Sequence, residues 1–225
     1  MLRRIAATAL LLLPLAACSA PAPAAPQPSA PPPPPPASSS QAPDAAPVVR
    51  AMLTAQDAAT LGFTSDTQPR AVSGPGLQLV GSCRDKLPSD AEIIQEQAKD
   101  WYTGDPLSVA VNLHQQTAQY PDGKAAQAVA ELLAAGGCTA GTGSPTGTKQ
   151  PQLAAAPGVD AQAAVCSEYE GPFAERNCVV VVAHGTLVTS AALDVQGNAA
   201  GEAKRKADAV FGKLGPLLAA AVTRA

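Results

Sequence analysis

The chain has 225 residues, and its 18 acidic and 15 basic side chains give a formal net charge of −3 at pH 7. This length suffices for one domain with its own core, and 3 Phe, 3 Tyr and 1 Trp leave Ala, Val and Leu to build it. The acidic balance argues against a nucleic-acid partner, since the one dense basic cluster, Lys204-Arg205-Lys206, is typical of a solvated helix face.

The first 17 residues have the pattern of an export signal. Arg3 and Arg4 precede an apolar run, residues 5–17, that ends in small side chains. A membrane-spanning helix needs about 20 apolar residues, and Pro14 interrupts this run earlier. We therefore predict a lipoprotein signal peptide over residues 1–17 rather than a membrane span.

The cysteine after this run predicts a lipid anchor. Leu15-Ala16-Ala17-Cys18 resembles the bacterial lipobox, in which the cysteine sulfur receives a diacylglyceryl group and the chain is cut just before it. Two or more acyl chains, such as palmitate, hold a protein firmly on a bilayer. We expect Cys18 to be the lipid attachment site, at the extracytoplasmic face of the cell membrane. The alternative is a cleaved signal peptide with a chance cysteine nearby.

Residues 18–48 form the next segment, and Pro, Ala, Ser and Gln dominate it from position 19 to position 47. Such a composition cannot bury enough apolar surface to offset the entropy of ordering, so we expect a disordered linker. Proline favours the extended polyproline II conformation, which predicts a stiff spacer. A proline-recognition ligand at residues 31–36 is the alternative. The folded domain is expected over residues 49–225.

A short helix is predicted at the start of the domain, in the sequence LTAQDAATLGF of residues 53–63. Thr54 is a suitable N-cap, and Asp57 three positions later completes a capping box. Gly62 can end the helix in a left-handed turn. After a loop rich in Pro and Gly, residues 77–80 predict a brief strand that leads to Cys83.

A second helix is predicted from Ser89, because Ser89 and Glu92 have the spacing of a capping box. Its apolar residues share one helical face: Ala91, Ile94, Ala98 and Trp101. Trp101 is therefore expected in the core. Together with Tyr102 it could instead line a cleft.

Residues 107–114, LSVAVNLH, alternate between apolar and polar and predict a strand with one buried face. After Pro121, Asp122 can cap a helix, and Gly136-Gly137 can end it before Cys138. The buried face of this helix would hold Ala125, Val129, Leu132 and Leu133. The sequence TAGTGSPTGTKQP of residues 139–151 predicts a mobile loop.

Three further strands are predicted from residues 163–169 and from the sequence CVVVVAHGTLVTSAAL of residues 178–193, which turns at Gly185 into a hairpin. The four consecutive valines indicate a central strand covered on both faces. A long amphipathic helix, kinked or restarted at Gly215-Pro216, closes the chain. Its apolar face would hold Ala203, Ala207, Val210, Phe211, Leu214, Leu218 and Val222. This order of elements predicts an α+β fold, an antiparallel sheet packed with helices.

Four cysteines remain in the domain, Cys83, Cys138, Cys166 and Cys178, and outside the cytoplasm this even number predicts two disulfides. The chain has no C-x-x-C and no histidine at ligand spacing, so no zinc site, other metal or cofactor is expected. Three connectivities are possible. We favour Cys166 with Cys178, because they bracket a short loop between two strand-like runs, and Cys83 with Cys138 by remainder.

No residue pattern predicts catalysis. The motifs G-x-S-x-G and H-E-x-x-H are absent, and the glycine-rich residues 141–147 lack the flanking strand and helix of a phosphate loop. His114 and His184 each fall near a predicted strand end. They could bind a metal or sense pH if the two ends met, and solvated side chains are the alternative. Arg84, next to Cys83, could meet an anionic ligand, and a solvated side chain is the alternative. The carboxylates are interpreted as turn, cap and surface residues: Asp105, Asp122, Asp160 and Glu168.

Several stretches follow one another in a recognisable order. They are LTAQDAATLGF, Cys83, VNLHQQTAQYPDGKAAQAVAELLAAGGC, APGVDAQAA, CVVVVAHGTLVTSAAL and the closing amphipathic helix, and they cover residues 52–222. This order resembles that of the PknH-like extracellular sensor domains of actinobacteria, which occur as ectodomains of membrane serine/threonine kinases and as free-standing lipoproteins. The resemblance implies a single α+β domain with two disulfides and a cleft for an unidentified ligand, without enzymatic activity.

The cysteines depart from that family's pattern. In the kinase ectodomain the second disulfide embraces the last hairpin, whereas here Cys178 begins the hairpin and Cys166 precedes it. No binding residue is therefore carried over. The expected function is that of a non-catalytic surface lipoprotein that binds a small ligand or an envelope component. Docking to a protein partner is the alternative from another class, followed by an envelope hydrolase.

Overall fold

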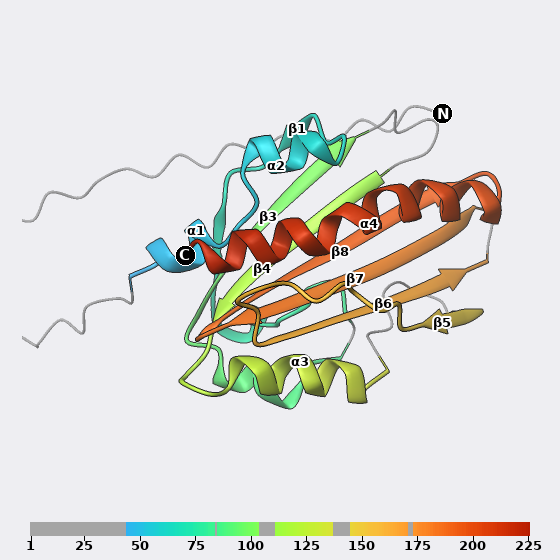
Figure 1. Cartoon of the computed structure of the whole chain (residues 1–225). Coiled ribbons are helices and arrows are strands. Elements are labelled where there is room, and N and C mark those ends of the chain that lie inside the picture. The colour runs from blue at the N-terminus through green and yellow to red at the C-terminus, as the bar shows by residue number, and fades with distance from the viewer. Residues whose placement is uncertain (1–43, 84, 104–110, 137–144, 171–172) are drawn as a thin grey trace, which may run out of the picture. The chain divides into compact units, whose positions relative to one another are not determined.

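The computed structural model describes residues 44–83, 85–103, 111–136, 145–170 and 173–225. Within these ranges eight strands form one sheet in the order β1-β3-β4-β8-β7-β6-β5, with β2 also pairing with β3 (Figure 1). Every pairing is antiparallel and helices lie on both faces, which confirms the predicted α+β fold. The strands are β1 (Ser65–Asp66), β2 (Arg70–Val72), β3 (Gln95–Thr103), β4 (Val111–Gln119), β5 (Gly147–Lys149), β6 (Ala161–Tyr169), β7 (Ala174–His184) and β8 (Leu187–Gly197).

Strand β7 lies between β6 and β8 and is covered on both faces. Val180 and Val182 belong to the core that includes α4 (Ala200–Thr223), which we call the α4-side core. Val179 and Val181 belong to the core that includes α3 (Ala125–Ala134), the α3-side core. All four valines are at most 2% exposed, which confirms the predicted central strand. The predicted hairpin is also present, and its Gly185 has a φ of 59°.

Helix α4 covers one face of β7 and β8 (Figure 1). It is continuous over 24 residues with Pro216 inside it, so the predicted restart at Gly215-Pro216 is wrong. Gly215 is buried against Leu153, and a Cβ atom there would lie 3.2 Å from Leu153 Cδ2. This close approach explains the glycine before the proline. The predicted apolar face is buried except at the half-buried Phe211.

Two short helices precede the sheet and join the α4-side core, α1 (Ala46–Arg50) and α2 (Ala55–Thr60). Thr54 caps α2 in the predicted capping box with Asp57, and Gly62 follows with a φ of 91°. Helix α1 includes residues 46 and 47. These are the last two residues of the stretch, residues 19–47, whose composition predicts disorder. The adjoining Val48 is fully buried.

Helix α3 covers the opposite face and confirms the helix predicted after Pro121. It buries Ala125, Ala128, Val129 and Leu132, and Gly136 follows it with a φ of 72°. The predicted cap is wrong, because the N-cap is Lys124 and its side chain makes no capping bond. Gly123 has a φ of 76°, and the Lys124 N–H donates to the Pro121 carbonyl at 3.1 Å. Asp122 therefore lies in a turn that precedes the helix.

The helix predicted from Ser89 is wrong. The chain makes a short 3-10 helix, η2 (Pro88–Glu92), and enters β3 at Gln95. Gln, Glu, Ala and Lys favour helix, but β3 pairs along its whole length with β4, and this tertiary context overrides the local propensity. Trp101 is buried as expected, on a strand instead of a helix.

The brief strand predicted at residues 77–80 is also wrong. Leu79 and Val80 are buried in the α3-side core, but their segment is a bend without strand pairing. Its main chain bonds to side chains instead, as in the 2.8 Å bond from the Leu79 N–H to Asp90. A second 3-10 helix, η1 (Gly74–Gly76), precedes it.

Strand β4 extends five residues beyond the predicted end at His114. Val111 and Leu113 are buried as predicted, and residues 107–110 of the predicted strand lie outside the described residues. Part of the loop predicted over residues 139–151 is an edge strand, because β5 pairs with β6. Residues 139–144 lie outside the described part of the chain.

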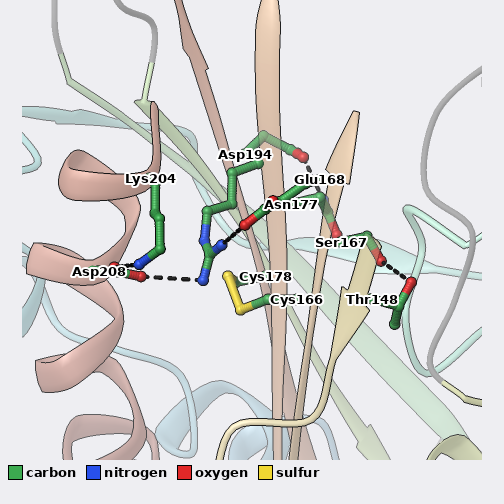
Figure 2. Close-up of a disulfide and its surroundings, with 10 residues drawn as sticks. Thr148, Cys166, Ser167, Glu168, Asn177, Cys178, Asp194, Lys204 and Asp208 are labelled. Atoms are coloured by element: carbon green, nitrogen blue, oxygen red, sulfur yellow. Dashed lines mark hydrogen bonds and ion pairs between the residues drawn. A yellow bond between two sulfur atoms is a disulfide. The ribbon is translucent and has the colours of Figure 1, made fainter. Parts of the chain in front are cut away.

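The predicted disulfide between Cys166 and Cys178 is confirmed. The two residues lie directly opposite each other on β6 and β7, with Cα atoms 4.0 Å apart (Figure 2). The bridge therefore joins paired strands rather than clamping a loop. The other favoured pairing, Cys83 with Cys138, depends on Cys138, which lies outside the described residues, as do Cys18 and the predicted signal peptide.

Candidate functional site

Polar side chains are buried along the second half of β4, where Gln115, Gln116 and Thr117 are at most 3% exposed. Burial of a polar side chain is costly unless it is hydrogen-bonded. Successive residues of a strand point to opposite faces, so Gln116 serves the α3 side while Gln115 and Thr117 serve the α4 side. On each face these side chains hold a chain segment that lacks strand pairing.

On the α3 side, Gln116 holds residues 77–82 against the sheet. Its amide oxygen accepts a hydrogen bond from the Gly81 N–H, and its amide nitrogen donates to the Gln78 carbonyl at 3.1 Å and to the Glu96 carboxylate. Glu96 also accepts from the Gln78 N–H at 2.9 Å. A Cβ atom at Gly81 would overlap the Gln116 amide, so this contact requires glycine.

Glu96 is the charged centre of this arrangement and is only 1% exposed. Burial raises the pKa of Glu96 to about 7, although the hydrogen bonds from Gln78 and Gln116 act in the opposite direction. Burial also raises the pKa of the neighbouring Asp90, which accepts bonds from the Leu79 and Leu87 N–H groups. The α3 side therefore carries two carboxyl groups that bind protons more readily than exposed ones.

On the α4 side, Gln115 holds the chain between α1 and α2. Its Oε1 accepts from the Leu53 N–H at 3.1 Å, and its Nε2 donates to Thr189 Oγ1 at 3.1 Å. Thr117 Oγ1 lies 3.1 Å from the same Thr189 oxygen. This network holds the main chain at Leu53, and residues 52–54 form part of the wall of a hollow in the surface.

The hollows on the surface of the described residues include three of about 330 to 390 Å³. Two have no charged side chain in their lining, one beside Leu133 and residues 150–153 and one between residues 154–157 and the end of α4. The third, of about 330 Å³, has three charged lining residues, all basic, in a chain of net charge −3. We call it the basic hollow, and its lining is Val49, Arg50, Met52, Leu53, Thr54, Pro69, Lys99 and Arg224.

Lys99 projects from β3 into the lining of the basic hollow. Its Nζ lies 2.6 Å from the Asp66 carboxylate and 3.9 Å from the centroid of the Trp101 ring. The side chain is 11% exposed, so the ammonium group is held in a largely dry position. A cation over an aromatic face is further stabilised by the ring quadrupole.

Arg224 and Arg50 bring the two ends of the described chain to the same hollow. Arg224 donates through Nη2 to the Met52 carbonyl at 2.7 Å and to Asp57 at 3.2 Å. Arg50 donates through Nη2 to the main-chain oxygen of Ala225 at 3.2 Å. The basic hollow therefore joins α1, the start of α2, β3 and the end of α4.

A row of polar residues crosses the sheet at its other end, on the same face as Val179. Its members are directly opposite one another in the strand register: Tyr102, Asn112, Asp194, Asn177, Ser167 and Thr148. Asn177 donates to Asp194, and the Ser167 and Thr148 hydroxyls lie 3.4 Å apart (Figure 2). Burial raises the pKa of Asp194. Two pairs within the row thus bond to each other across neighbouring strands, which favours a structural role.

An ion-pair cluster centred on the buried Arg176 lies beside the disulfide, and its other members are half-exposed. Arg176, 6% exposed, donates from Nη1 to Glu168 and from Nη2 to Asp208 at 3.1 Å, and Lys204 Nζ lies 2.5 Å from Asp208 (Figure 2). The cluster ties β6 and β7 to α4. Glu168 lies at the surface as expected, with its side chain 40% exposed, and its partner Arg176 also bonds to Asp208 of α4.

The two histidines singled out in the sequence do not meet. His114 lies within β4 opposite Asp100 of β3, and its Nδ1 contacts the Asp100 carboxylate. His184 ends β7, where its Nδ1 lies 4.0 Å from Asp160, and Asp160 accepts from the Gly185 N–H at 2.6 Å. Among the described residues, no three His, Cys, Asp or Glu side chains are placed to hold a metal ion.

The remaining sequence candidates are scattered. Asp122 is exposed in the turn before α3, and Tyr102 is 42% exposed at the end of β3. The basic cluster at residues 204–206 lies on the exposed face of α4, as predicted. Arg84 and Asp105 lie outside the described residues. None of the sequence candidates for function lines the basic hollow.

Comparison with protein-family models, curated proteins and solved structures finds no match to this chain. In the part of the chain that the structure describes, no helix combines the length and apolar character needed to cross a membrane. The basic hollow is therefore selected on its geometry, because of the three hollows it alone combines apolar walls with converging charged groups.

Proposed function

We propose that this chain is a lipid-anchored extracytoplasmic binding protein that takes a small ligand into the basic hollow and catalyses no reaction. One observation carries the proposal: the hollow of about 330 Å³ combines apolar walls with a few convergent polar groups, the usual make-up of a ligand site. In this proposal Cys18 is the anchor, residues 18–48 are the spacer, and Cys83 with Cys138 forms a second disulfide. A sensor role of the PknH-like kind is consistent with such a layout.

The walls of the basic hollow support the proposal because they are fixed before any ligand arrives. Met52 and Leu53 are each 3% exposed, and the Leu53 main chain is held by Gln115. The side chain of Arg224 is held by the Met52 carbonyl. A site built in this way loses little conformational freedom on binding.

Binding can be tested by native mass spectrometry of the full chain purified from its own host. We expect a retained small molecule in the natural protein and its loss in Val49→Trp, whose indole would fill the hollow. Ile94→Trp is the matched control, because Ile94 is 47% exposed and does not line the hollow. A protein that retains nothing, or Val49→Trp that retains as much as the control, would contradict the proposal.

The anchor is tested separately by cell fractionation. Cys18→Ser is expected to move the protein out of the membrane fraction and to abolish incorporation of labelled palmitate. If Cys18→Ser stays in the membrane pellet to the same extent, the anchor is wrong while the binding site remains testable.

An envelope hydrolase is the second candidate, and one observation favours it. The Asp100 carboxylate contacts His114 Nδ1, an arrangement that can orient an imidazole for acid–base catalysis. Among the described residues, no hydroxyl or thiol is seen to bond to this imidazole. Release of p-nitrophenol from p-nitrophenyl acetate that is lost in His114→Ala would favour the hydrolase over the binding protein.

A further inference from the structure

We infer that the ligand of the basic hollow is an amphiphilic anion, a phosphate or carboxylate group that carries a short apolar chain; this inference rests on the proposed binding function. Charge selects the anionic part. The lining holds three basic residues and no acidic one. A cleft lined by one sign of charge concentrates ligands of the opposite sign.

The cations are already placed for such a group. Asp66 and the Trp101 ring fix the ammonium group of Lys99, and Asp57 fixes the guanidinium group of Arg224. Neither carboxylate is part of the lining of the hollow. Both contacts of Arg224 use Nη2, and a guanidinium group has five N–H donors in a planar fork that matches carboxylate and phosphate oxygens.

The remaining lining selects an apolar chain. Val49, Met52, Leu53 and Pro69 line the hollow beside the cations, and Val49 is 41% exposed. Met52 and Leu53 are already buried, but a bare inorganic anion would leave the exposed Val49 and Pro69 uncovered. Each methylene group that the hollow buries is expected to strengthen binding about fourfold.

Isothermal titration calorimetry tests the inference with three probes: hexyl phosphate, inorganic phosphate and 1-hexanol. The full chain is purified from cell envelopes in a non-ionic detergent, and detergent alone is the blank. We expect hexyl phosphate to bind at least about tenfold more tightly than inorganic phosphate, since several methylenes are buried. We expect no detectable binding of 1-hexanol.

Variants locate the site. Lys99→Gln and Arg224→Gln should each weaken the binding of hexyl phosphate about tenfold or more, because hydrogen bonds to charged groups are strong. Lys206→Gln makes the same change of charge on the exposed face of α4 and should leave binding within about twofold. Two separate variants keep the test decisive if one of them fails to fold.

Each contrary result has a distinct meaning. Equal affinity for hexyl phosphate and inorganic phosphate overturns the apolar part of the inference. Binding of hexyl phosphate that survives both Lys99→Gln and Arg224→Gln overturns the anion site. The proposed function stands in both cases if Val49→Trp still loses the molecule that the natural protein retains, and it fails if the natural protein retains no molecule or if Val49→Trp retains that molecule as well as the control does.

Discussion

Strands β7 and β4 are both buried on two faces, but they are buried by opposite means. In β7, Val179 to Val182 pack alternately into the α3-side and α4-side cores. In β4, Gln115, Gln116 and Thr117 are as deeply buried, yet they bond to polar atoms of other segments. Apolar burial requires only volume, whereas polar burial requires a partner for each donor and acceptor.

This difference assigns the two strands different tasks. β7 joins the two cores of the domain, and helices α3 and α4 pack against its two faces. Such apolar packing tolerates other side chains of similar volume. β4 positions two segments that lie outside the strands, residues 51–54 and 77–82. Because residues 52–54 line the basic hollow, the polar strand also shapes the candidate site.

Removal of one polar anchor should have the largest effect on stability. Gln116→Leu leaves the Gly81 N–H without its acceptor and the buried Glu96 without its amide donor. We expect the free energy of unfolding to fall by about 3–5 kcal/mol, as for other buried charges that lose a partner. Urea unfolding followed by Trp101 fluorescence measures it. Gln97→Leu, at a half-buried position on β3, is the control and should cost under about 1 kcal/mol; equal losses in both would contradict the anchoring role.

The pH dependence of stability sharpens the comparison, because Glu96 titrates and the valines of β7 do not. Burial raises the pKa of Glu96 from 4.5 to about 7, so the folded state binds a proton more tightly than the unfolded state. The contribution of Glu96 to stability is therefore full below pH 4.5 and is lost as the pH rises through about 7. The difference amounts to about 3 kcal/mol.

Glu96→Gln isolates this effect, because the other titrating groups are shared by both proteins. We expect the free energy of unfolding of the natural protein to fall more steeply between pH 5 and pH 8 than that of the variant. Urea unfolding at a series of pH values gives both slopes. Parallel slopes would mean that Glu96 does not titrate in this range.

Truncation of β7 should cost less and should be the same on both faces. Val180→Ala and Val181→Ala remove the same two methyl groups from the α4-side and α3-side cores. We expect each to lower the free energy of unfolding by about 2 kcal/mol through lost burial and a small cavity. Chemical denaturation measures both. A loss under about 0.5 kcal/mol in one of them would show that its face is not tightly packed.

The apolar part of the fold could be predicted from the sequence because its signals are local. The run of valines, the turn at Gly185 and the periodicity of α4 each lie within one stretch of chain. Cys166 and Cys178 could be paired because they bracket a short loop between two strand-like runs. The helix assigned to residues 89–101 failed because β3 is rich in helix-favouring residues, and only its pairing with β4 makes it a strand.

The candidate site could not be predicted, since each of its signals depends on distant partners. Gln115 and Gln116 are residues typical of a solvated segment. Their burial depends on hydrogen bonds from the Leu53 and Gly81 N–H groups, which are far away in the sequence. Lys99 and Trp101 share a face only if residues 95–103 form a strand. Arg50 and Arg224 meet because the chain folds back on itself, which no local pattern encodes.

The smallest effects should come from the glycines of α4, the layer that covers β7. Gly212 is exposed and a Cβ atom there meets nothing within 4 Å, so Gly212→Ala should stabilise the helix. The gain is expected to be only about 0.5 kcal/mol, because Pro216 cannot donate to the Gly212 carbonyl.

Gly215→Ala is the matched change at a packed position of α4. Its Cβ atom would lie 3.2 Å from Leu153 Cδ2, so Leu153 must move and the gain in helix propensity is offset. Thermal unfolding of both variants should place Gly212→Ala slightly above the natural protein and Gly215→Ala at or below it. If both raise the melting temperature equally, Leu153 yields without cost. The packing of α4 on β7 would then tolerate small changes in side-chain volume. The hydrogen bonds of β4, each of which needs a particular partner, would differ from it even more.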